Sequence, residues 1–577
     1  MNRSEERLIS LFFLICLAGL VSCSSQTLPT SPAQVLTHTA MPSVSFPPGT
    51  LTGEVVDQDG MPVAGAQVSI QATSHTTLTD REGRFRLTGL ESGVPLTVSA
   101  WKDKYYCAGQ ASILPPASGI HLVLRLVQTN DNPAYRWVPP TGENSCYSCK
   151  PGVTQVWLDN DAHGKSAVNT RFLSMYNGTD LQGNRSPLTR YTESRDYGRM
   201  PIPPDPNKPY YGPGYKLDFP NASGNCATCH IPGAAMDNPY GVDPNQVSGV
   251  DKFGIHCDFC HKIGGVLLDP KTSLPYSDMP GVLSLDLRRP FPTDPQRYQL
   301  FFGTFADDNV PMEDTRLPLI SQSQFCAACH YGIFWDTLVY NSYGEWYQSP
   351  YSDPKTGKTC QDCHTPSPTL FDGKPLTNVA PGKGGVERDP LTIHAHTFPG
   401  ASSASLLQNA VTMKVDTQKQ GSQVSVRVKI TNDKTGHDVP SDSPLRHLIL
   451  LVEAFNAKGN RLPYLQGEKI PDWGGVGDPK NGYYAGLPGK AYAKILAELW
   501  TEISPSGAYW NPTRLVSDNR LAPYASDSST YIFDHPEQGA VTVHVRLIYR
   551  RAYRSLADQK GWVIPDIVMA EKTMVVK

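Results

Sequence analysis

The chain has 577 residues, which at roughly 150 residues per domain suggests three or four domains. Hydrophobic residues make up 39% and charged residues 18%, a globular composition that excludes a wholly disordered chain or a coiled coil. The net charge of −3 gives no electrostatic basis for nucleic-acid binding, so no nucleic-acid partner is expected.

The N-terminus has the pattern of an export signal. After two arginines, residues 8–20 form an almost entirely apolar run of 13 residues. This length is typical of a signal-peptide core and is too short for a membrane-spanning helix. Two kinds of signal peptide remain open: a lipoprotein signal, for which the cysteine at the end of the run is decisive, and an ordinary signal peptide that happens to contain a cysteine.

The apolar run ends in Leu20-Val21-Ser22-Cys23, which resembles a bacterial lipobox. The resemblance implies removal of a signal peptide at 1–22, lipidation of the Cys23 thiol and a membrane attachment through acyl chains. Two serines and no aspartate follow Cys23, which favours the outer membrane or the cell surface. The Ser/Thr/Pro-rich segment 23–48 is predicted to be a disordered linker.

Residues 49–128 have the period of two that is typical of strands, with turns at Asp59-Gly60 and Glu82-Gly83. The pattern GxVxDxxGxPVxGAxVxI from Gly53, followed by TDxxGxFxL from Thr79, resembles the carboxypeptidase-regulatory-like, transthyretin-like β-sandwich. The resemblance implies a spacer or adhesion module and not an enzyme.

Four segments read Cys-x-x-Cys-His, where composition alone would give about 0.008 such motifs. The pattern is the attachment signature of haem c: two thiols add to the porphyrin vinyl groups, and the histidine is the proximal iron ligand. Zinc binding or thioredoxin-type chemistry does not explain a histidine at the fifth position four times. The residues are Cys226, Cys229 and His230; Cys257, Cys260 and His261; Cys326, Cys329 and His330; and Cys360, Cys363 and His364.

A fifth segment, Cys146-Tyr147-Ser148-Cys149-Lys150, keeps the cysteine spacing but replaces histidine by lysine. A lysine amine ligates iron only where its surroundings lower its pKa strongly. Three interpretations stay open: Lys150 is the proximal ligand of an open, substrate-binding haem, it ligates a six-coordinate electron-transfer haem, or it is no ligand and the cysteines form a disulfide. Five haem c groups use ten cysteines and leave Cys16, Cys23 and Cys107.

Five histidines outside the motifs are candidate distal ligands, because five irons need a sixth ligand. They are His163, His256, His394, His396 and His437. His256 directly precedes Cys257, where the chain geometry is awkward, and His163 is the candidate considered for the Lys150 haem.

Residues 135 to about 400 resemble the multihaem cytochrome c family that contains cytochrome c554 and hydroxylamine-oxidoreductase-like proteins. The resemblance is carried by residues 254–263, 325–330, 343–346 and 349–364. It implies electron transfer through closely stacked, mostly bis-histidine haems.

One lysine motif followed by four histidine motifs also resembles the order in pentahaem ammonia-forming nitrite reductases, whose first haem is lysine-ligated and catalytic. Here Lys262-Ile263-Gly264 follows His261, without the tyrosine which that family has there. Lys150 is therefore the one catalytic candidate, and no catalytic trio can be transferred.

Alternation returns after His396, at 411–415, 424–430, 448–452 and 541–547, and predicts a second β-sandwich over 406–577. Gly436-His437-Asp438-Val439-Pro440 resembles a loop of related multihaem cytochromes, which implies that it reaches back to a haem. The expected fold is thus an N-terminal β-sandwich, a mainly helical and loop domain at 129–405 packed around haem, and a C-terminal β-sandwich.

These features favour an exported, lipid-anchored cytochrome with five haem c groups that relays electrons across or outside the cell envelope. Its expected partners are redox proteins or an extracellular electron acceptor. Two alternatives are a nitrite- or hydroxylamine-type reductase acting at the Lys150 haem, and a structural subunit of a cell-surface cytochrome assembly.

Overall fold

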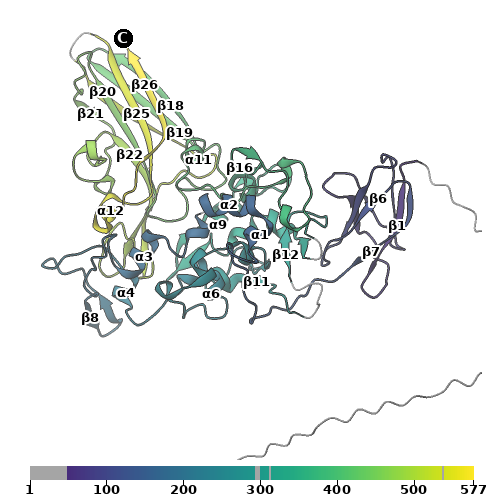
Figure 1. Ribbon diagram of the computed structural model, residues 1–577. Coiled ribbons are helices and arrows are strands. Elements are labelled where there is room, and N and C mark those ends of the chain that lie inside the picture. Colours follow the sequence, from purple (N-terminus) through teal and green to yellow (C-terminus); the bar gives the residue numbers. More distant parts are fainter. Residues whose placement is uncertain (1–47, 161, 293–298, 311–312, 536–538) are drawn as a thin grey trace, which may run out of the picture. The chain divides into compact units, whose positions relative to one another are not determined.

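The computed structural model describes residues 48–160, 162–292, 299–310, 313–535 and 539–577 (Figure 1). The predicted signal peptide, Cys16, Cys23 and nearly all of the predicted linker lie outside these residues. Every element below belongs to the compact unit 47–577. Within the described residues, no helix has the length and apolar character needed to span a membrane.

Two small sheets form the N-terminal domain. One has the order β4-β1-β7, with β1 antiparallel to β4 and parallel to β7, and the other is antiparallel with the order β3-β2-β5-β6. The strands are β1 (Leu51–Asp57), β2 (Gln67–Ile70), β3 (Thr76–Leu78), β4 (Arg84–Leu87), β5 (Leu96–Trp101), β6 (Ala108–Ile113) and β7 (Ala117–Leu124).

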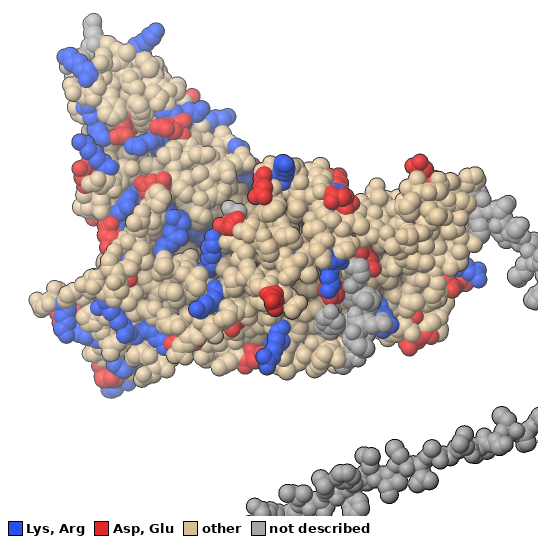
Figure 2. All heavy atoms as spheres, in the orientation of Figure 1, with Lys and Arg blue, Asp and Glu red and all other residues tan. Residues whose placement is uncertain are grey.

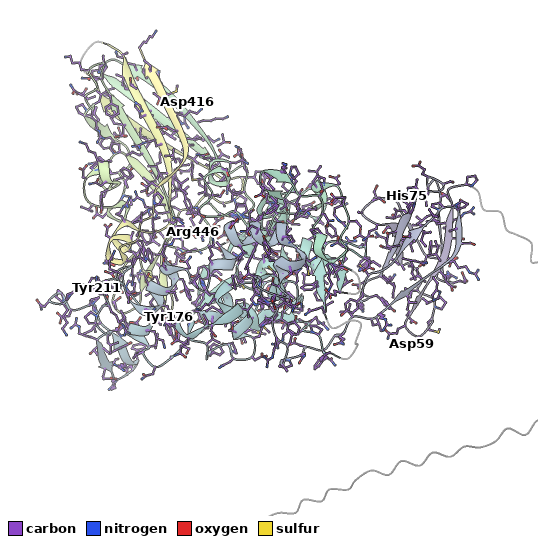
Figure 3. All side chains as sticks on the ribbon, in the orientation of Figure 1. Asp59, His75, Tyr176, Tyr211, Asp416 and Arg446 are labelled. Atoms are coloured by element: carbon purple, nitrogen blue, oxygen red, sulfur yellow. The ribbon has the colours of Figure 1, made fainter. Side chains whose placement is uncertain are left out.

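The turn after β1 shows how the sequence sets the local fold. The Asp57 Oδ1 atom accepts the backbone N–H groups of Asp59 and Met61, both at 2.9 Å, and Gly60 has a φ of +76°. Asp59 is labelled in Figure 3. Fully buried residues such as Leu51 and Val55 form the core between the sheets, and each stabilises the domain by about 1.5–3 kcal/mol.

The central region is not mainly helical, which corrects the expectation from the sequence. Its longest described helix, α2 (Pro151–Asn160), has ten residues. The other helices are α1 (Cys146–Cys149), α3 (Thr170–Asn177), α4 (Tyr215–Asp218), α5 (Ala227–His230), α6 (Pro232–Ala235), α7 (Cys257–Cys260), α8 (Gln324–Ala327), α9 (Ser342–Tyr347) and α10 (Cys360–His364). Frequent proline and glycine keep helices short, and irregular segments predominate.

Two-stranded sheets and short 3-10 helices, among them η1 (His163–Lys165), complete the central region. The strand pairs are β8 (Tyr191–Ser194) with β9 (Gly198–Pro201), β10 (Ile263–Val266) with β11 (Leu285–Leu287), β12 (Phe301–Gly303) with β13 (Asp314–Arg316), β14 (Gly332–Phe334) with β15 (Thr337–Tyr340), and β16 (Leu370–Phe371) with β17 (Lys374–Pro375). Sheets this small cannot bury a core of their own.

Two antiparallel sheets form the C-terminal domain, with the strand orders β18-β19-β24-β21 and β23-β22-β20-β25-β26. The strands are β18 (Thr412–Gln420), β19 (Gln423–Thr431), β20 (His447–Phe455), β21 (Tyr464–Gln466), β22 (Gly489–Glu498), β23 (Thr513–Asp518), β24 (Ser526–Asp534), β25 (Val541–Arg550) and β26 (Ile567–Val576). Helix α11 (Ala404–Gln408) precedes the strands, and α12 (Arg554–Lys560) follows β25.

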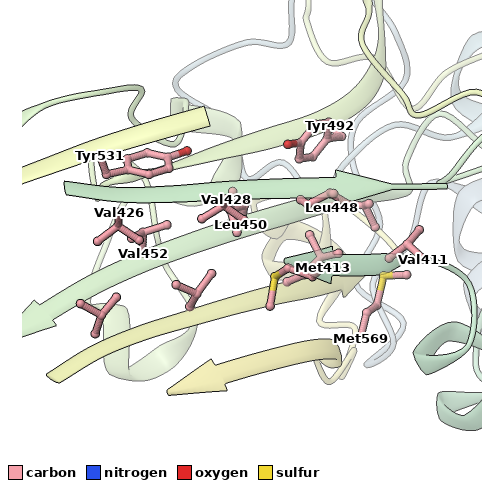
Figure 4. Packing of buried hydrophobic residues seen from close by; sticks show 14 of the residues in the cluster. Val411, Met413, Val426, Val428, Leu448, Leu450, Val452, Tyr492, Tyr531 and Met569 are labelled. Carbon is pink, nitrogen blue, oxygen red and sulfur yellow. The ribbon is translucent and has the colours of Figure 1, made fainter. Parts of the chain in front are cut away.

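Alternating residues of these strands fill the core of the C-terminal domain (Figure 4). Val426 and Val428 of β19 and Leu448 and Leu450 of β20 are at most 1% exposed. On the outer surface, acidic and basic side chains are interspersed over the face that Figure 2 shows, as the near balance of 51 Lys and Arg against 54 Asp and Glu suggests.

Candidate functional site

Four of the five Cys-x-x-Cys motifs form one helical turn, and in the motif that begins at Cys326 helix α8 ends at Ala327 and Cys329 lies in the following turn. Helices α1, α7 and α10 begin at the first cysteine of their motifs, and a preceding side chain caps each of them: Ser145, His256 and Thr359 accept the backbone N–H three residues on. One helical turn places the two thiols, three residues apart, on the same face. The motif thus presents both sulfur atoms and the fifth side chain to one side.

The motifs surround one cavity of about 2010 Å³. Pockets for a single small ligand measure about 300–1,000 Å³, so this cavity has room for more than one large group. Tyr176 and Arg446, labelled in Figure 3, are on its wall. The wall also includes Cys146, Cys149, Lys150, Cys226, Cys229, His230, Cys257, Cys260, His261, Cys326, Cys329, His330, Cys360, Cys363 and His364, together with His163, His256, His394, His396 and His437.

The ten motif cysteines are all free thiols, Cys146 and Cys149 included, and the folded chain brings different motifs together. The pKa of the Cys326 thiol is raised mainly by its hydrogen bond with the Cys360 thiol and secondly by burial. The Cys229 thiol acts in the same way on Cys329. The motifs at 326 and 360, only 34 residues apart in sequence, are thus also neighbours in space.

Three motif histidines each face one of the candidate distal histidines. The ring centres are 6.4 Å apart for His364 and His437, 6.3 Å for His261 and His396, and 6.2 Å for His330 and His163. A ligating imidazole nitrogen lies about 2.0 Å from the metal ion and about 1.2 Å from the centre of its own ring. Two imidazoles that bind one metal ion from opposite sides therefore have ring centres about 6.4 Å apart. The three pairs therefore have the spacing of bis-histidine iron sites.

The hydrogen bonds of these rings leave Nε2 for a metal. His261 donates from Nδ1 to the Phe302 carbonyl at 2.5 Å, and His364 donates to the Pro399 carbonyl at 2.7 Å. His437 donates to the Asp438 carbonyl at 2.9 Å. A ring whose Nδ1 carries the proton has its lone pair on Nε2, the form in which histidine ligates metals.

His163, which the sequence suggested for the Lys150 haem, has its ring opposite that of His330. It begins η1, and its ring also packs edge-on against Phe398 at 4.9 Å. The 82° angle between the His163 and His330 rings differs from the 24° of the His364–His437 pair.

His256 does not have the hydrogen bonding of a ligand. Its Nδ1 accepts the backbone N–H of Phe259 at 3.2 Å as the cap of α7, so the ring proton is on Nε2. The Nε2 atom is buried and has no hydrogen-bond partner within the described part of the chain. Burial lowers the pKa of His256 to about 4, and its ring packs edge-on against Trp137. A proton on Nε2 leaves that nitrogen no lone pair for iron.

His394 and His230 lack a histidine ring opposite them among the residues described. His394 donates from Nδ1 to the Thr365 carbonyl at 3.0 Å, so its Nε2 is in the form that ligates metals. The His230 ring stacks on Phe172, with centres 4.0 Å apart and planes 3° from parallel. Phe172 was not recognised from the sequence, because nothing in its local pattern distinguishes it from a core aromatic.

Lys150 ends α1 and points into surroundings that disfavour its charge. Burial lowers the pKa of its amine, and the carboxylate of Asp314 acts in the opposite direction. Burial likewise raises the pKa of Asp314. A lowered pKa is what a lysine ligand requires, because only the neutral amine has a lone pair.

Cys107 has a different environment from the motif cysteines. It is completely buried, and burial followed by the charge of Asp314 raises the pKa of its thiol. A thiol in this state is unreactive. Among the described residues, no group of three or more His, Cys, Asp or Glu side chains could hold a bare metal ion.

Comparison with known families identifies the first domain. Residues 50–119 match the carboxypeptidase regulatory-like domain family. This portion of the chain is a carboxypeptidase regulatory-like domain. The match agrees with the two sheets of β1–β7 and with the sequence pattern from Gly53.

No curated protein matches the chain. Among solved structures, a penta-heme cytochrome c552 from Thermochromatium tepidum is similar with a TM-score of 0.48 and 16% identity, over 75% of this chain and 97% of that chain. A cohesin–X-dockerin complex from Acetivibrio cellulolyticus is similar with a TM-score of 0.13 and 20% identity, over 14% of this chain and 58% of that chain.

Proposed function

We propose that the chain is an exported, lipid-anchored cytochrome that carries five haem c groups and relays electrons across or outside the cell envelope. Its donors and acceptors are redox proteins or an extracellular electron acceptor. The lipid on Cys23 attaches it to the membrane, at the outer membrane or the cell surface.

The observation that carries the proposal is the convergence of five motifs on one cavity. Ten free thiols line it together with three histidine pairs whose ring centres are 6.2–6.4 Å apart. Each pair joins a motif histidine to a histidine from a distant part of the chain. Disulfide chemistry and a catalytic triad both leave these paired rings unexplained.

The residues fit haem c in number and in chemistry. Haem c supplies a one-electron iron couple when it is bound. The chain supplies two thiols per group, Nε2 lone pairs on His261, His330 and His364, and a cavity lined by many apolar side chains. The Nδ1–H groups of these histidines are held by the protein, which fixes the ring orientation.

The test is a reductive titration of the purified full-length protein with the electrons counted. An electron relay of this design takes up five electrons per chain between the fully oxidised and fully reduced states. Uptake of no electrons, or of two electrons in one concerted step by a thiol–disulfide couple, would contradict the proposal.

One observation favours a second candidate function, reduction of a small nitrogen oxyanion or hydroxylamine at the Lys150 haem. His163, His396 and His437 face other motifs, and the hydrogen bonding of His256 does not suit ligation. Only His394 of the five candidates then remains for the Lys150 and His230 sites. Among the residues that the structure describes, one of these two sites therefore lacks a distal histidine, and it can leave a position open to substrate.

Electron paramagnetic resonance of the oxidised protein separates the two functions. A reductase requires a high-spin ferric signal of about one haem per chain that changes when nitrite or hydroxylamine is added. A pure relay shows low-spin signals alone, and these do not respond to either compound.

A further inference from the structure

His330 differs from the other motif histidines in what its ring contacts. Its Nδ1 lies 3.0 Å from the Oδ2 atom of Asp442, whereas His261 and His364 donate to the neutral backbone carbonyls of Phe302 and Pro399. In the described structure, His330 is the one motif histidine whose ring is hydrogen-bonded to a carboxylate. Asp442 is 112 residues away in sequence and belongs to the C-terminal domain.

Asp442 is held in place by its surroundings. Its side chain is only 14% exposed, and its other oxygen, Oδ1, accepts the hydroxyl of Ser342 at 2.6 Å. The guanidinium of Arg446 lies 4.0 Å from Oδ2. The backbone of Asp442 has a φ of +60°, a left-handed conformation that aspartate tolerates better than most residues but that still costs energy. The fold thus maintains a strained residue to aim this carboxylate at His330.

We propose that Asp442 is a positioning residue that lowers the reduction potential of the haem bound by Cys326, Cys329 and His330, and that this group has the lowest potential of the histidine-motif haems. The inference rests on the proposed function. It concerns which site holds its electron least tightly, and therefore the direction of electron flow along the relay.

The physical reason is the strength of the hydrogen bond. A carboxylate accepts the Nδ1–H more strongly than a neutral carbonyl does, which increases the electron donation of Nε2 to the metal. Stronger donation stabilises the more highly charged ferric state relative to the ferrous state, so the potential falls. The negative charge of Asp442, whose side chain is only 14% exposed, acts in the same direction.

The Ser342 hydroxyl moderates this effect, because it uses part of the acceptor capacity of the same carboxylate. Removal of the Ser342 hydroxyl leaves the Asp442 carboxylate a stronger acceptor of the hydrogen bond from His330 Nδ1–H. Two substitutions at this hydrogen-bonded chain therefore have opposite expected signs, which a general loss of structure would not produce.

The experiment is a spectroelectrochemical titration of the full-length protein and three variants. Asp442→Asn keeps the side-chain shape and removes the charge, and one midpoint potential is expected to move to a more positive value while the others stay within error. Ser342→Ala is expected to move the same step to a more negative value. Asp527→Asn is the matched control, because its carboxylate pairs with Lys490 and not with a histidine ring.

Equal shifts of the potential in Asp442→Asn and Asp527→Asn would overturn the inference, since such shifts would reflect the change in net charge alone. No shift in Asp442→Asn, or shifts of the same sign in Asp442→Asn and Ser342→Ala, would overturn it as well. If Asp442→Asn does not accumulate, the sign of the Ser342→Ala shift decides. Haem content by mass spectrometry is measured on each sample: fewer haems than five in the unmodified chain contradicts the proposed function, whereas five haems with unmoved potentials contradicts only this inference.

Discussion

The second ring nitrogen of each histidine determines what the residue can do. Carbonyl or carboxylate acceptors hold the Nδ1–H of His261, His330 and His364, and Nε2 remains a donor to iron. In His256 the same nitrogen accepts a backbone N–H, which makes that residue a helix cap. Sequence position alone does not reveal the acceptors that hold His261, His330 and His364, because these acceptors come from other segments.

The His437→Ala variant tests a single distal pair. His437 faces His364 across 6.4 Å, so its loss should convert one haem per chain from low-spin to high-spin and let that haem bind cyanide. Electron paramagnetic resonance of the oxidised protein measures the change. His544→Ala is the control, because the His544 ring packs against Phe455 in the C-terminal sheet. Identical spectra for His437→Ala and the unmodified chain would remove His437 from the ligands.

At the scale of elements, the strands were predictable and the helices were not. The alternation at 424–430 predicted β19, because that strand has one face in the core, and the apolar segment 448–452 predicted β20, whose residues are buried on both faces. The central region offered no such period. Most of its helices have only four to six residues, and the motif cysteines on them line a cavity, so the helical part of the expected helical and loop domain was wrong.

Helix α12 is joined to the central region by one buried lysine. Lys560 is fully buried and donates from Nζ to the carbonyls of Ser174, Thr179 and Pro213, at 3.1, 3.2 and 2.6 Å. Burial lowers the pKa of Lys560 to about 7. The contribution of Lys560 to the free energy of unfolding therefore depends on pH.

Lys560→Met should lower the free energy of unfolding by about 1–3 kcal/mol at pH 7, because buried carbonyls lose their donor. Between pH 7 and about 10 the unfolded chain keeps the Lys560 proton and the folded chain releases it, so the stability of the unmodified protein should rise with pH relative to the variant. Urea unfolding at several pH values measures both effects. Lys458→Met, at an exposed turn, is the control, and an equal response of the two variants would show that Lys560 has no special role.

At the scale of the whole molecule, the site depends on residues far apart in the chain. His437 and Asp442 come from one loop of the C-terminal domain, yet they contact histidines of two different motifs, His364 and His330. The sequence identified the motif residues through their spacing and suggested that the His437 loop reaches back. It could not assign the pairs or find Asp442, because neither depends on a local pattern.

Attachment to the membrane is a separate prediction for the whole molecule. Cys23→Ala removes the thiol that the lipobox resemblance marks for lipidation. The variant should still be exported but should move from the membrane to the soluble fraction on cell fractionation, with its haem content unchanged. Retention of the variant in the membrane fraction would contradict the lipid anchor and leave the haem assignment intact.

The central claim is that five motifs hold haem c covalently, and the intact mass of the mature protein tests it most directly. Five haem additions per chain are expected, and four in the Cys146→Ser, Cys149→Ser double variant. Four additions in the unmodified protein would show that Cys146 and Cys149 carry no haem. A mass without haem additions would contradict the account as a whole.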